Sequence, residues 1–235
     1  MLKINTATHT ADWTTITGFD STTFKFSGGV LGNNGLIYGI PYYATFALII
    51  DPATDAIDTT TLSVSSDDAK WSGGVVVPDG RIFGIPYYAD AVLIIDPATN
   101  TIDTTSIAGL GNSRWAGVAL ANNGRIYGLP GAIDAVLIVD PETMTADTST
   151  ISGLGNGGDS WLGGVLANNG KIYGIPFNEE AVLIIDPETN TADTTTLANV
   201  GSGQSKYADG VLANNGKIFG FPSNVDNALV ISPGC

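Results

Sequence analysis

An aromatic residue recurs along the chain at intervals of 45, 44, 46 and 46 residues. Aromatic faces at matched positions in a repeat could stack on sugar rings or on other flat ligands. The same positions would also suit packing between adjacent repeats, so the spacing alone leaves ligand binding and packing as alternatives. The residues are Phe26, Trp71, Trp115, Trp161 and Tyr207.

Three further side chains are candidates for the same ligand site. Tyr43 and Tyr88, together with their neighbours Tyr42 and Tyr87, make the first two repeats rich in aromatic residues and predict a groove on one side of the molecule. Asp209 stands where the other repeats have glycine, and its carboxylate either contacts a ligand or is a solvated product of sequence drift. The corresponding glycines are Gly28, Gly73, Gly117 and Gly163.

Residues for catalysis and for metal binding are scarce in this sequence. It contains one histidine, His9, and one cysteine, Cys235. Nucleophilic catalysis by a serine or cysteine beside a histidine, and a metal cluster of histidine and cysteine, therefore have too few residues. Glycoside hydrolysis needs two carboxylates across a cleft, and only Asp209 lies in an inner strand. We predict no catalytic residue, no metal and no cofactor, and expect that the chain is not an enzyme, with a hydrolase as the minor alternative.

The elements that position these residues follow one pattern in every repeat, clearest in the second. A glycine-rich strand at Ser72 to Val77 is followed by a turn with Asp-Gly or Asn-Gly, which favours an antiparallel hairpin with the strand Arg81 to Pro86. An apolar strand, Ala91 to Asp96, and a threonine-rich strand, Thr101 to Ile107, complete the unit. Four short strands in each repeat of 40 to 50 residues are typical of β-propellers. We predict an all-β, five-bladed β-propeller with four antiparallel strands per blade.

The two ends of the chain match different parts of one repeat. The last copy stops before its threonine-rich strand, while Ile4 to Gly18 aligns with Ile95 to Gly109. This predicts a closed ring in which the N-terminal strand completes the last blade. We expect a single domain over residues 1–235, with blades at about 24–63, 70–108, 114–152, 160–198, and 206–235 together with 1–17.

Charge and hydropathy exclude several classes of partner. The net charge is −14, from 23 acidic and 9 basic residues, which argues against nucleic acid. Apolar runs are too short to span a bilayer, and the first residues lack the features of a signal peptide.

Many of the acids have an expected structural role in turns and edge strands. These are Asp12, Asp58, Asp103, Asp147 and Asp193 in the fourth strands, and Asp51, Asp96, Asp140 and Asp186 in the turns before them.

Two segments of each unit resemble known repeats. The fourth unit has GKIYGIP at Gly170 to Pro176 and AVLIIDPETNT at Ala181 to Thr191. These segments resemble kelch repeats and the YVTN-type repeats of bacterial surface propellers. The chain departs from kelch by having Gly-Ile-Pro in place of Gly-Gly, and Ala-Asp-Thr in place of a tryptophan after the turn. The resemblance implies a binding module or a scaffold, and it favours an extracellular or cell-surface location. Five blades are also similar to tachylectin-like sugar binders and to five-bladed glycosidases, and no motif singles out either.

The repeats differ mainly in two sets of loops, which alternating strand direction places on one face. They join the fourth strand to the next blade and the second strand to the third, and loops of a rigid scaffold often carry its function. Basic residues in the first set, such as Lys70 and Lys206, could pair with acids of the second set or meet an anionic ligand. We predict a non-catalytic binding module that uses this face for carbohydrate or a protein partner, with a monomer favoured. The alternative is a structural or assembly propeller without a small-molecule ligand.

Overall fold

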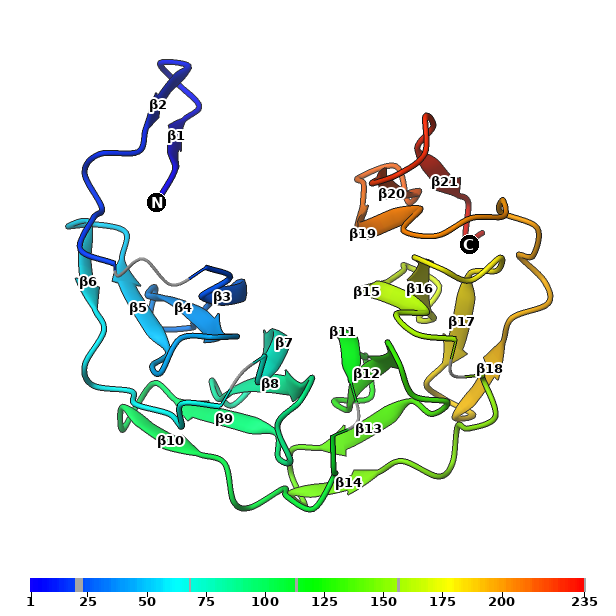
Figure 1. The fold of residues 1–235 in the computed structure, drawn as a ribbon, viewed down its shortest axis with the longest axis horizontal. Coiled ribbons are helices and arrows are strands. Elements are labelled where there is room, and N and C mark those ends of the chain that lie inside the picture. Colours follow the sequence, from blue (N-terminus) through cyan, green and yellow to red (C-terminus); the bar gives the residue numbers. More distant parts are fainter. Residues whose placement is uncertain (20–22, 68, 113, 156, 235) are drawn as a thin grey trace.

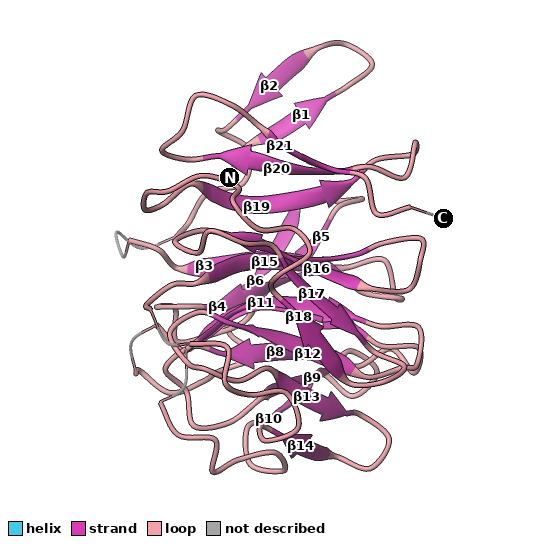
Figure 2. Cartoon of the chain, turned by 90° about the vertical axis from the view of Figure 1, so that its right-hand side faces the viewer, coloured by secondary structure: helices cyan, strands magenta, loops and turns pink. Residues whose placement is uncertain are grey.

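The computed structural model describes residues 1–19, 23–67, 69–112, 114–155 and 157–234, and Cys235 lies outside these ranges. Its regular elements are β-strands, and five antiparallel sheets follow one another around a common axis as the blades of a β-propeller (Figure 1). The predicted fold class is confirmed. Figure 2 views the blades from the side, with the loops at both ends of the strands. No helix in the described part of the chain could cross a membrane.

The strands of each blade are called a to d from the axis outward. The fourth strand d is present in the first four blades, and the fifth blade has three strands. In chain order the blades are β3 (Phe26–Leu31), β4 (Ile37–Pro41), β5 (Leu48–Asp51) and β6 (Ala56–Asp58); β7 (Trp71–Val76), β8 (Ile82–Pro86), β9 (Leu93–Asp96) and β10 (Thr101–Asp103); β11 (Trp115–Leu120), β12 (Ile126–Pro130), β13 (Leu137–Asp140) and β14 (Thr145–Asp147); β15 (Trp161–Leu166), β16 (Ile172–Pro176), β17 (Leu183–Asp186) and β18 (Thr191–Asp193); and β19 (Tyr207–Leu212), β20 (Ile218–Pro222) and β21 (Leu229–Ile231).

The prediction that an N-terminal strand completes the last blade is wrong. β1 (Lys3–Asn5) and β2 (Thr10–Asp12) pair with each other, and β21 remains the outer strand of a three-stranded sheet. The reason is that this segment corresponds to both strands c and d of a repeat. Asn5 pairs with Thr10 in the register that Asp96 and Thr101 use in blade 2. Figure 1 shows the resulting open ring, with a free arc between the hairpin and β19–β21.

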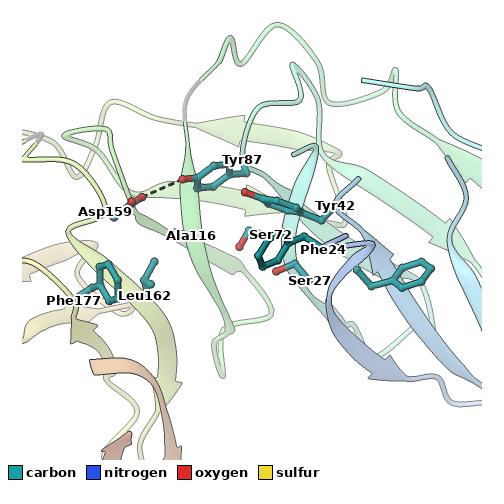
Figure 3. A pocket seen from close by; sticks show the side chains of 10 residues that line it. Phe24, Ser27, Tyr42, Ser72, Tyr87, Ala116, Asp159, Leu162 and Phe177 are labelled. Carbon is teal, nitrogen blue, oxygen red and sulfur yellow. Dashed lines mark hydrogen bonds between the residues drawn. The ribbon is translucent and has the colours of Figure 1, made fainter. Parts of the chain in front are cut away.

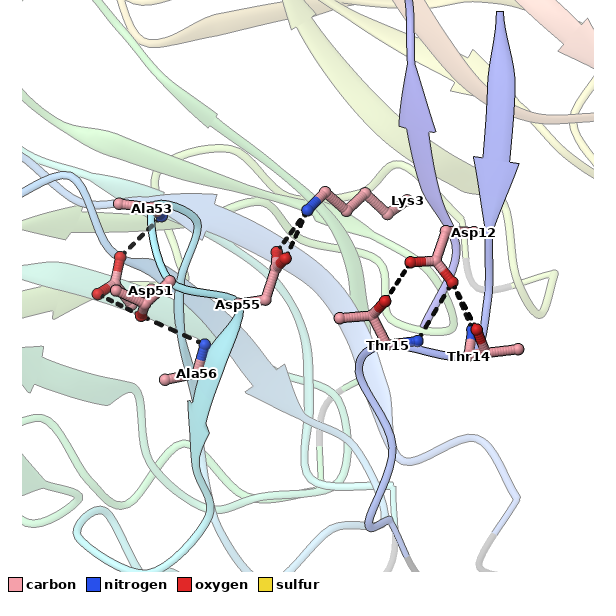
Figure 4. Close-up of polar contacts among 9 residues, drawn as sticks. Lys3, Asp12, Thr14, Thr15, Asp51, Ala53, Asp55 and Ala56 are labelled. Carbon is pink, nitrogen blue, oxygen red and sulfur yellow. Dashed lines mark hydrogen bonds and ion pairs between the residues drawn. The ribbon is translucent and has the colours of Figure 1, made fainter.

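The N-terminal hairpin is fixed to blade 1 at its outer edge. The Lys3 ammonium lies 2.6 Å from a carboxylate oxygen of Asp55, in the turn between β5 and β6 (Figure 4). The N-terminal amine of Met1 donates a hydrogen bond to the Ile16 carbonyl at 3.0 Å. Because both partners of the ion pair are partly exposed, this pair contributes at most about 1 kcal/mol.

The aspartates of strand d hold the turn that follows them. The carboxylate of Asp103 accepts hydrogen bonds from the backbone amides of Thr105 and Ser106 and from both hydroxyls. The Ser106 hydroxyl is the main cause that lowers the pKa of Asp103 to about 2. Asp58 has the same arrangement with Thr60 and Thr61, and its pKa is also lowered to about 2. The structural role expected for these acids is therefore seen in the hydrogen bonds.

Adjacent blades pack by placing one aliphatic side chain of strand b against two glycines of the next blade, except that blade 3 has Val118 in place of the first glycine. A Cβ atom added at Gly74 would lie 2.8 Å from Cδ1 of Ile40, and one added at Gly84 would lie 3.4 Å from its Cγ2. Glycine is required here because a side chain would occupy the same space. Four side chains fill this position between consecutive blades, each of them fully buried: Ile40, Ile85, Leu129 and Ile175.

Candidate functional site

The two sets of variable loops meet on one face, as the sequence predicts. The backbone amide of Lys70, at the end of one d–a loop, donates to the carbonyl of Tyr42 in the b–c loop of the preceding blade, at 2.9 Å. The regular turns lie at the other ends of the strands, where Asn123 of blade 3 donates to the Pro187 carbonyl of blade 4 at 3.0 Å. The constant turns thus connect the blades on one face, and the variable loops surround the opening of the ring on the other.

A pocket of about 290 Å³ lies at this opening (Figure 3). Its wall combines aromatic rings, one carboxylate and small residues of the inner strands. The b–c loops contribute Tyr42, Tyr87 and Phe177, the d–a loops contribute Phe24 and Asp159, and the inner strands contribute Phe26, Ser27, Ser72, Ala116 and Leu162.

Local backbone geometry explains why these side chains reach the opening. Tyr42, Tyr87 and Phe177 each follow the proline that ends strand b, so the same position in three blades supplies an aromatic ring. Phe24 and Asp159 lie two residues before strand a and have φ of 48° and 47°. Non-glycine residues seldom adopt this left-handed conformation, and it recurs at the end of the d–a loop in all five blades. Such conformations often occur at functional sites.

Tyr87 and Asp159 form the polar centre of the pocket. The Tyr87 hydroxyl donates a hydrogen bond to Oδ1 of Asp159 at 3.1 Å. Burial and the nearby Asp159 carboxylate raise the pKa of Tyr87 above its ordinary value, so its hydroxyl stays protonated. The rings of Tyr42 and Tyr87 are tilted against each other with centroids 5.8 Å apart. The pocket therefore offers an aromatic surface beside a carboxylate that can accept hydrogen bonds.

The recurring aromatic residues of the sequence do not share one environment. Trp71, Trp115, Trp161 and Tyr207 are at most 3% exposed. Each indole N–H of the three tryptophans donates at 2.8 Å to the carbonyl of an alanine in the b–c loop of the same blade, two residues before strand c. The structure thus favours the packing alternative for these four residues. Phe26 differs, because it is half-buried and lines the pocket.

Asp209 lies deeper, on the wall of a cavity of about 460 Å³ between the inner strands. The side chain is exposed to this cavity, and its Oδ1 accepts a hydrogen bond from the Gly210 amide at 2.7 Å. A side chain at the neighbouring Gly163 would collide with this carboxylate. The placement is compatible with both alternatives drawn from the sequence, so a ligand contact by Asp209 stays a prediction.

Tyr43 and Tyr88, which the sequence analysis selects as ligand contacts, lie outside the pocket wall, and their neighbours Tyr42 and Tyr87 line it. Tyr43 packs edge-on against Tyr42 at 5.0 Å between centroids, and Tyr88 does the same against Tyr87 at 4.9 Å. Tyr88 is 39% exposed and carries the Arg114 guanidinium above its ring. They support Tyr42 and Tyr87 from behind.

The basic residues of the d–a loops are more buried than the sequence suggests. Lys70 and Lys206 are each 1% exposed. The Lys70 ammonium donates to the carbonyls of Tyr42 and Asp67, and that of Lys206 donates to those of Phe177 and Gly203. Burial lowers the pKa of Lys206. These lysines hold the backbone behind two pocket residues and so act in positioning the loops.

Sequence reasoning missed Phe24, Asp159 and Phe177, and it selected Tyr43 and Tyr88 as ligand contacts in place of their neighbours Tyr42 and Tyr87. A usable signal was present for Tyr42, Tyr87 and Phe177, because each directly follows the Gly-x-Pro that ends strand b. For Phe24 and Asp159 the d–a loops differ in length and sequence, and the left-handed backbone that turns these residues toward the ring opening leaves no mark in the sequence.

Comparison with solved structures shows which proteins share this architecture. Virginiamycin B lyase from Staphylococcus aureus has a TM-score of 0.69 at 12% identity, over 91% of this chain and 72% of that one. A catalytically inactive variant of that lyase, with a histidine replaced by alanine and with quinupristin, gives 0.64 at 13% identity, over 91% and 73%. An auxiliary nutrient-binding protein from Bacteroides ovatus gives 0.58 at 14% identity, over 85% and 57%. No protein-family model matches this sequence, and no curated protein sequence matches it.

The expectation that the chain is not an enzyme is contradicted by these neighbours, since they include a lyase of the same fold. A repetitive scaffold does not exclude catalysis, because its variable loops can make one asymmetric pocket. At these levels of identity the similarity shows the fold alone, and function has to be argued from the site.

Proposed function

We propose that the chain is a binding protein whose pocket at the ring opening takes a carbohydrate. The observation that carries the proposal is the combination of three aromatic rings from equivalent b–c positions with the Asp159 carboxylate. The C–H faces of a sugar ring can pack on aromatic surfaces, while its hydroxyls donate to a carboxylate.

The dimensions and charge of the pocket narrow the class of sugar. A cavity of about 290 Å³ lies near the small end of ligand pockets, which begin at about 300 Å³. It therefore suits one or two sugar units. The net charge of −14 and the Asp159 carboxylate disfavour an acidic sugar, so a neutral or amino sugar is the better ligand.

Blade 3 gives the pocket its asymmetry. The residue equivalent to Tyr42, Tyr87 and Phe177 in this blade is Gly131. A Cβ atom there would lie 2.6 Å from the Arg114 carbonyl oxygen, so the position cannot carry an aromatic ring without rearrangement. Blade 3 therefore contributes no aromatic ring at this position, and a ligand can approach Asp159 between Tyr87 and Phe177.

The nutrient-binding neighbour is compatible with such a role, and the kelch- or YVTN-type repeat segments support a binding module. A reaction at this pocket would use Asp159 and Tyr87, because the only histidine, His9, lies in the exposed turn between β1 and β2.

A glycan array with the purified chain and two matched variants tests this proposal. We expect binding by the wild type and by Trp13→Ala, which removes an exposed aromatic ring far from the pocket wall, next to β2. The double variant Asp159→Asn, Phe177→Ala should lose binding while it stays folded by circular dichroism. Absence of any bound glycan, or equal binding by the double variant, would contradict the proposal. Capture of a protein ligand that depends on the same residues would replace carbohydrate by a protein partner.

A further inference from the structure

The pocket at the ring opening continues along the axis into the cavity that holds Asp209. Beyond the pocket, residues of all five inner strands line this cavity of about 460 Å³, a volume within the range of ligand pockets. The two spaces therefore form one channel, which can hold more of a ligand than the pocket alone. Four residues line both spaces, and each is the second residue of strand a in its blade (Figure 3): Ser27, Ser72, Ala116 and Leu162.

Asp209 lies one residue deeper than this junction. It is the third residue of β19 and directly follows Ala208, which corresponds in blade 5 to the four shared residues. One residue of a strand spans about 3.3 Å, so a ligand that passes the junction reaches the Asp209 carboxylate.

The depth of Asp209 below the mouth of the pocket follows from its contact with blade 4. A Cβ atom added at Gly163 would lie 3.1 Å from the Cα atom of Asp209, so the two residues are at the same level. Gly163 is the fourth residue after Asp159, which lines the mouth. The two carboxylates are therefore at levels at most about 13 Å apart, which leaves room for a second sugar unit below the first.

The Asp209 carboxylate can accept further hydrogen bonds. Its Oδ1 accepts from the amide of the adjacent Gly210 at 2.7 Å, and within the described ranges its Oδ2 has no hydrogen-bond partner. No basic side chain is among the described residues that line the cavity. The ammonium of Lys206, three residues away, is directed to the carbonyls of Phe177 and Gly203 instead. Such a carboxylate favours a ligand group that is positively charged and donates hydrogen bonds.

The fold does not require an acid at this position. The other four blades have glycine here, and three of these glycines, Gly28, Gly73 and Gly163, have φ between 78° and 82°. Asp209 has a negative φ, so the left-handed conformation does not restrict the residue type in blade 5. Backbone geometry therefore does not explain the carboxylate, and its replacement is compatible with folding.

We propose that Asp209 selects a saccharide with a free amino group. Its carboxylate binds the ammonium of the inner sugar unit, while the outer unit packs on the aromatic rings of the pocket. This inference rests on the sugar site proposed above and names the class of sugar that the site prefers. Hydrogen bonds to ionised groups are roughly twice as strong as neutral ones, so an amine is favoured over a hydroxyl, and an acidic sugar would meet a like charge.

Three β-1,4-linked disaccharides that differ in the substituent at carbon 2 test the proposal by calorimetric titration. They are diglucosamine with a free amine, diacetylchitobiose with an acetamide, and cellobiose with a hydroxyl. The wild type should bind the amine about tenfold more tightly than the other two, or better. Asp209→Asn, and Asp209→Gly with the residue of the other blades, should abolish this preference and change the affinity for cellobiose little. Glu142→Gln removes an exposed carboxylate from a c–d turn on the opposite face and is the matched control, which should keep the preference.

Equal affinity of the wild type for diglucosamine and cellobiose would overturn the proposal, as would a preference that survives in both Asp209 variants. A preference lost in Asp159→Asn and kept in Asp209→Asn would place the amine at the mouth and overturn it as well. Binding of other glycans but none of these three would also overturn this inference and leave the proposed sugar site in place. Failure of the sugar site itself is distinct, because no glycan of the array would then bind. Circular dichroism of each variant separates these outcomes from a failure to fold.

Discussion

The insertion of one aliphatic side chain between two glycines predicts a large difference between two truncations at equivalent positions. Leu129 is fully buried, and its Cδ atoms lie 2.6 and 2.7 Å from the Cβ positions of Gly164 and Gly174 in the next blade. Leu129→Ala leaves a cavity that the two glycines cannot fill, so we expect a loss of about 3 to 5 kcal/mol in the free energy of unfolding. Phe221→Ala removes a side chain that is 51% exposed, and should cost less than about 1 kcal/mol in the single chain.

Urea unfolding followed by the fluorescence of the buried tryptophans measures both values. The measurement should use the lowest protein concentration that gives a signal. The slope of the free energy of unfolding against urea concentration should be equal for the variants that are compared. A cost for Phe221→Ala that equals the cost for Leu129→Ala at this concentration would refute the reasoning. It would mean that the fifth blade is covered within one chain and that the ring is closed.

Three further predictions concern the inner strands, the turns and the pocket. A Cβ atom at Gly117 would lie 2.8 Å from the Gly163 nitrogen, so Gly117→Ala should destabilise the fold by about 1 to 3 kcal/mol in urea unfolding, whereas Gly29→Ala should change it little. The pKa of Asp103 is lowered to about 2 in the folded chain, so its contribution to stability should be lost as the pH falls from about 4 to about 2; an unchanged pH dependence in Asp103→Asn would contradict this. Asp159→Asn should lower the raised pKa of Tyr87 in a tyrosinate absorbance titration, with Tyr87→Phe identifying the transition that belongs to this residue.

Repeat spacing and turn chemistry were enough to predict the blades and the two loop faces. The Asn-Gly and Asp-Gly turns fix the first hairpin of each unit, and the alternation of strand direction then assigns every loop to one end of the ring. The closure of the ring was predicted wrongly, although the relevant residues were recognised. The segment that begins at Ile4 was aligned with the end of strand c and the whole of strand d. Because it holds residues of both strands, it forms its own hairpin hydrogen bonds and does not add to the sheet of blade 5.

The pocket was harder to predict, because it depends on the direction of single side chains. Adjacent residues such as Tyr42 and Tyr43 point to different sides of the loop, and the sequence does not distinguish which ring faces the opening. For the aromatic residues at the start of strand a, the sequence left both ligand binding and packing between blades as alternatives. Burial in the structure separates Phe26, which lines the pocket, from the tryptophans, which hold the b–c loops through their indole N–H groups.

The central claim is that the aromatic rings and the carboxylate at the ring opening bind a sugar. Calorimetric titration of the wild type with the best glycan from the array, in parallel with Phe177→Ala and Trp13→Ala, tests it most directly. We predict that Phe177→Ala weakens binding about tenfold or more, which corresponds to about 1.4 kcal/mol, and that Trp13→Ala leaves the affinity unchanged. Equal affinity of Phe177→Ala and the wild type would contradict the claim and would place the ligand elsewhere on the molecule.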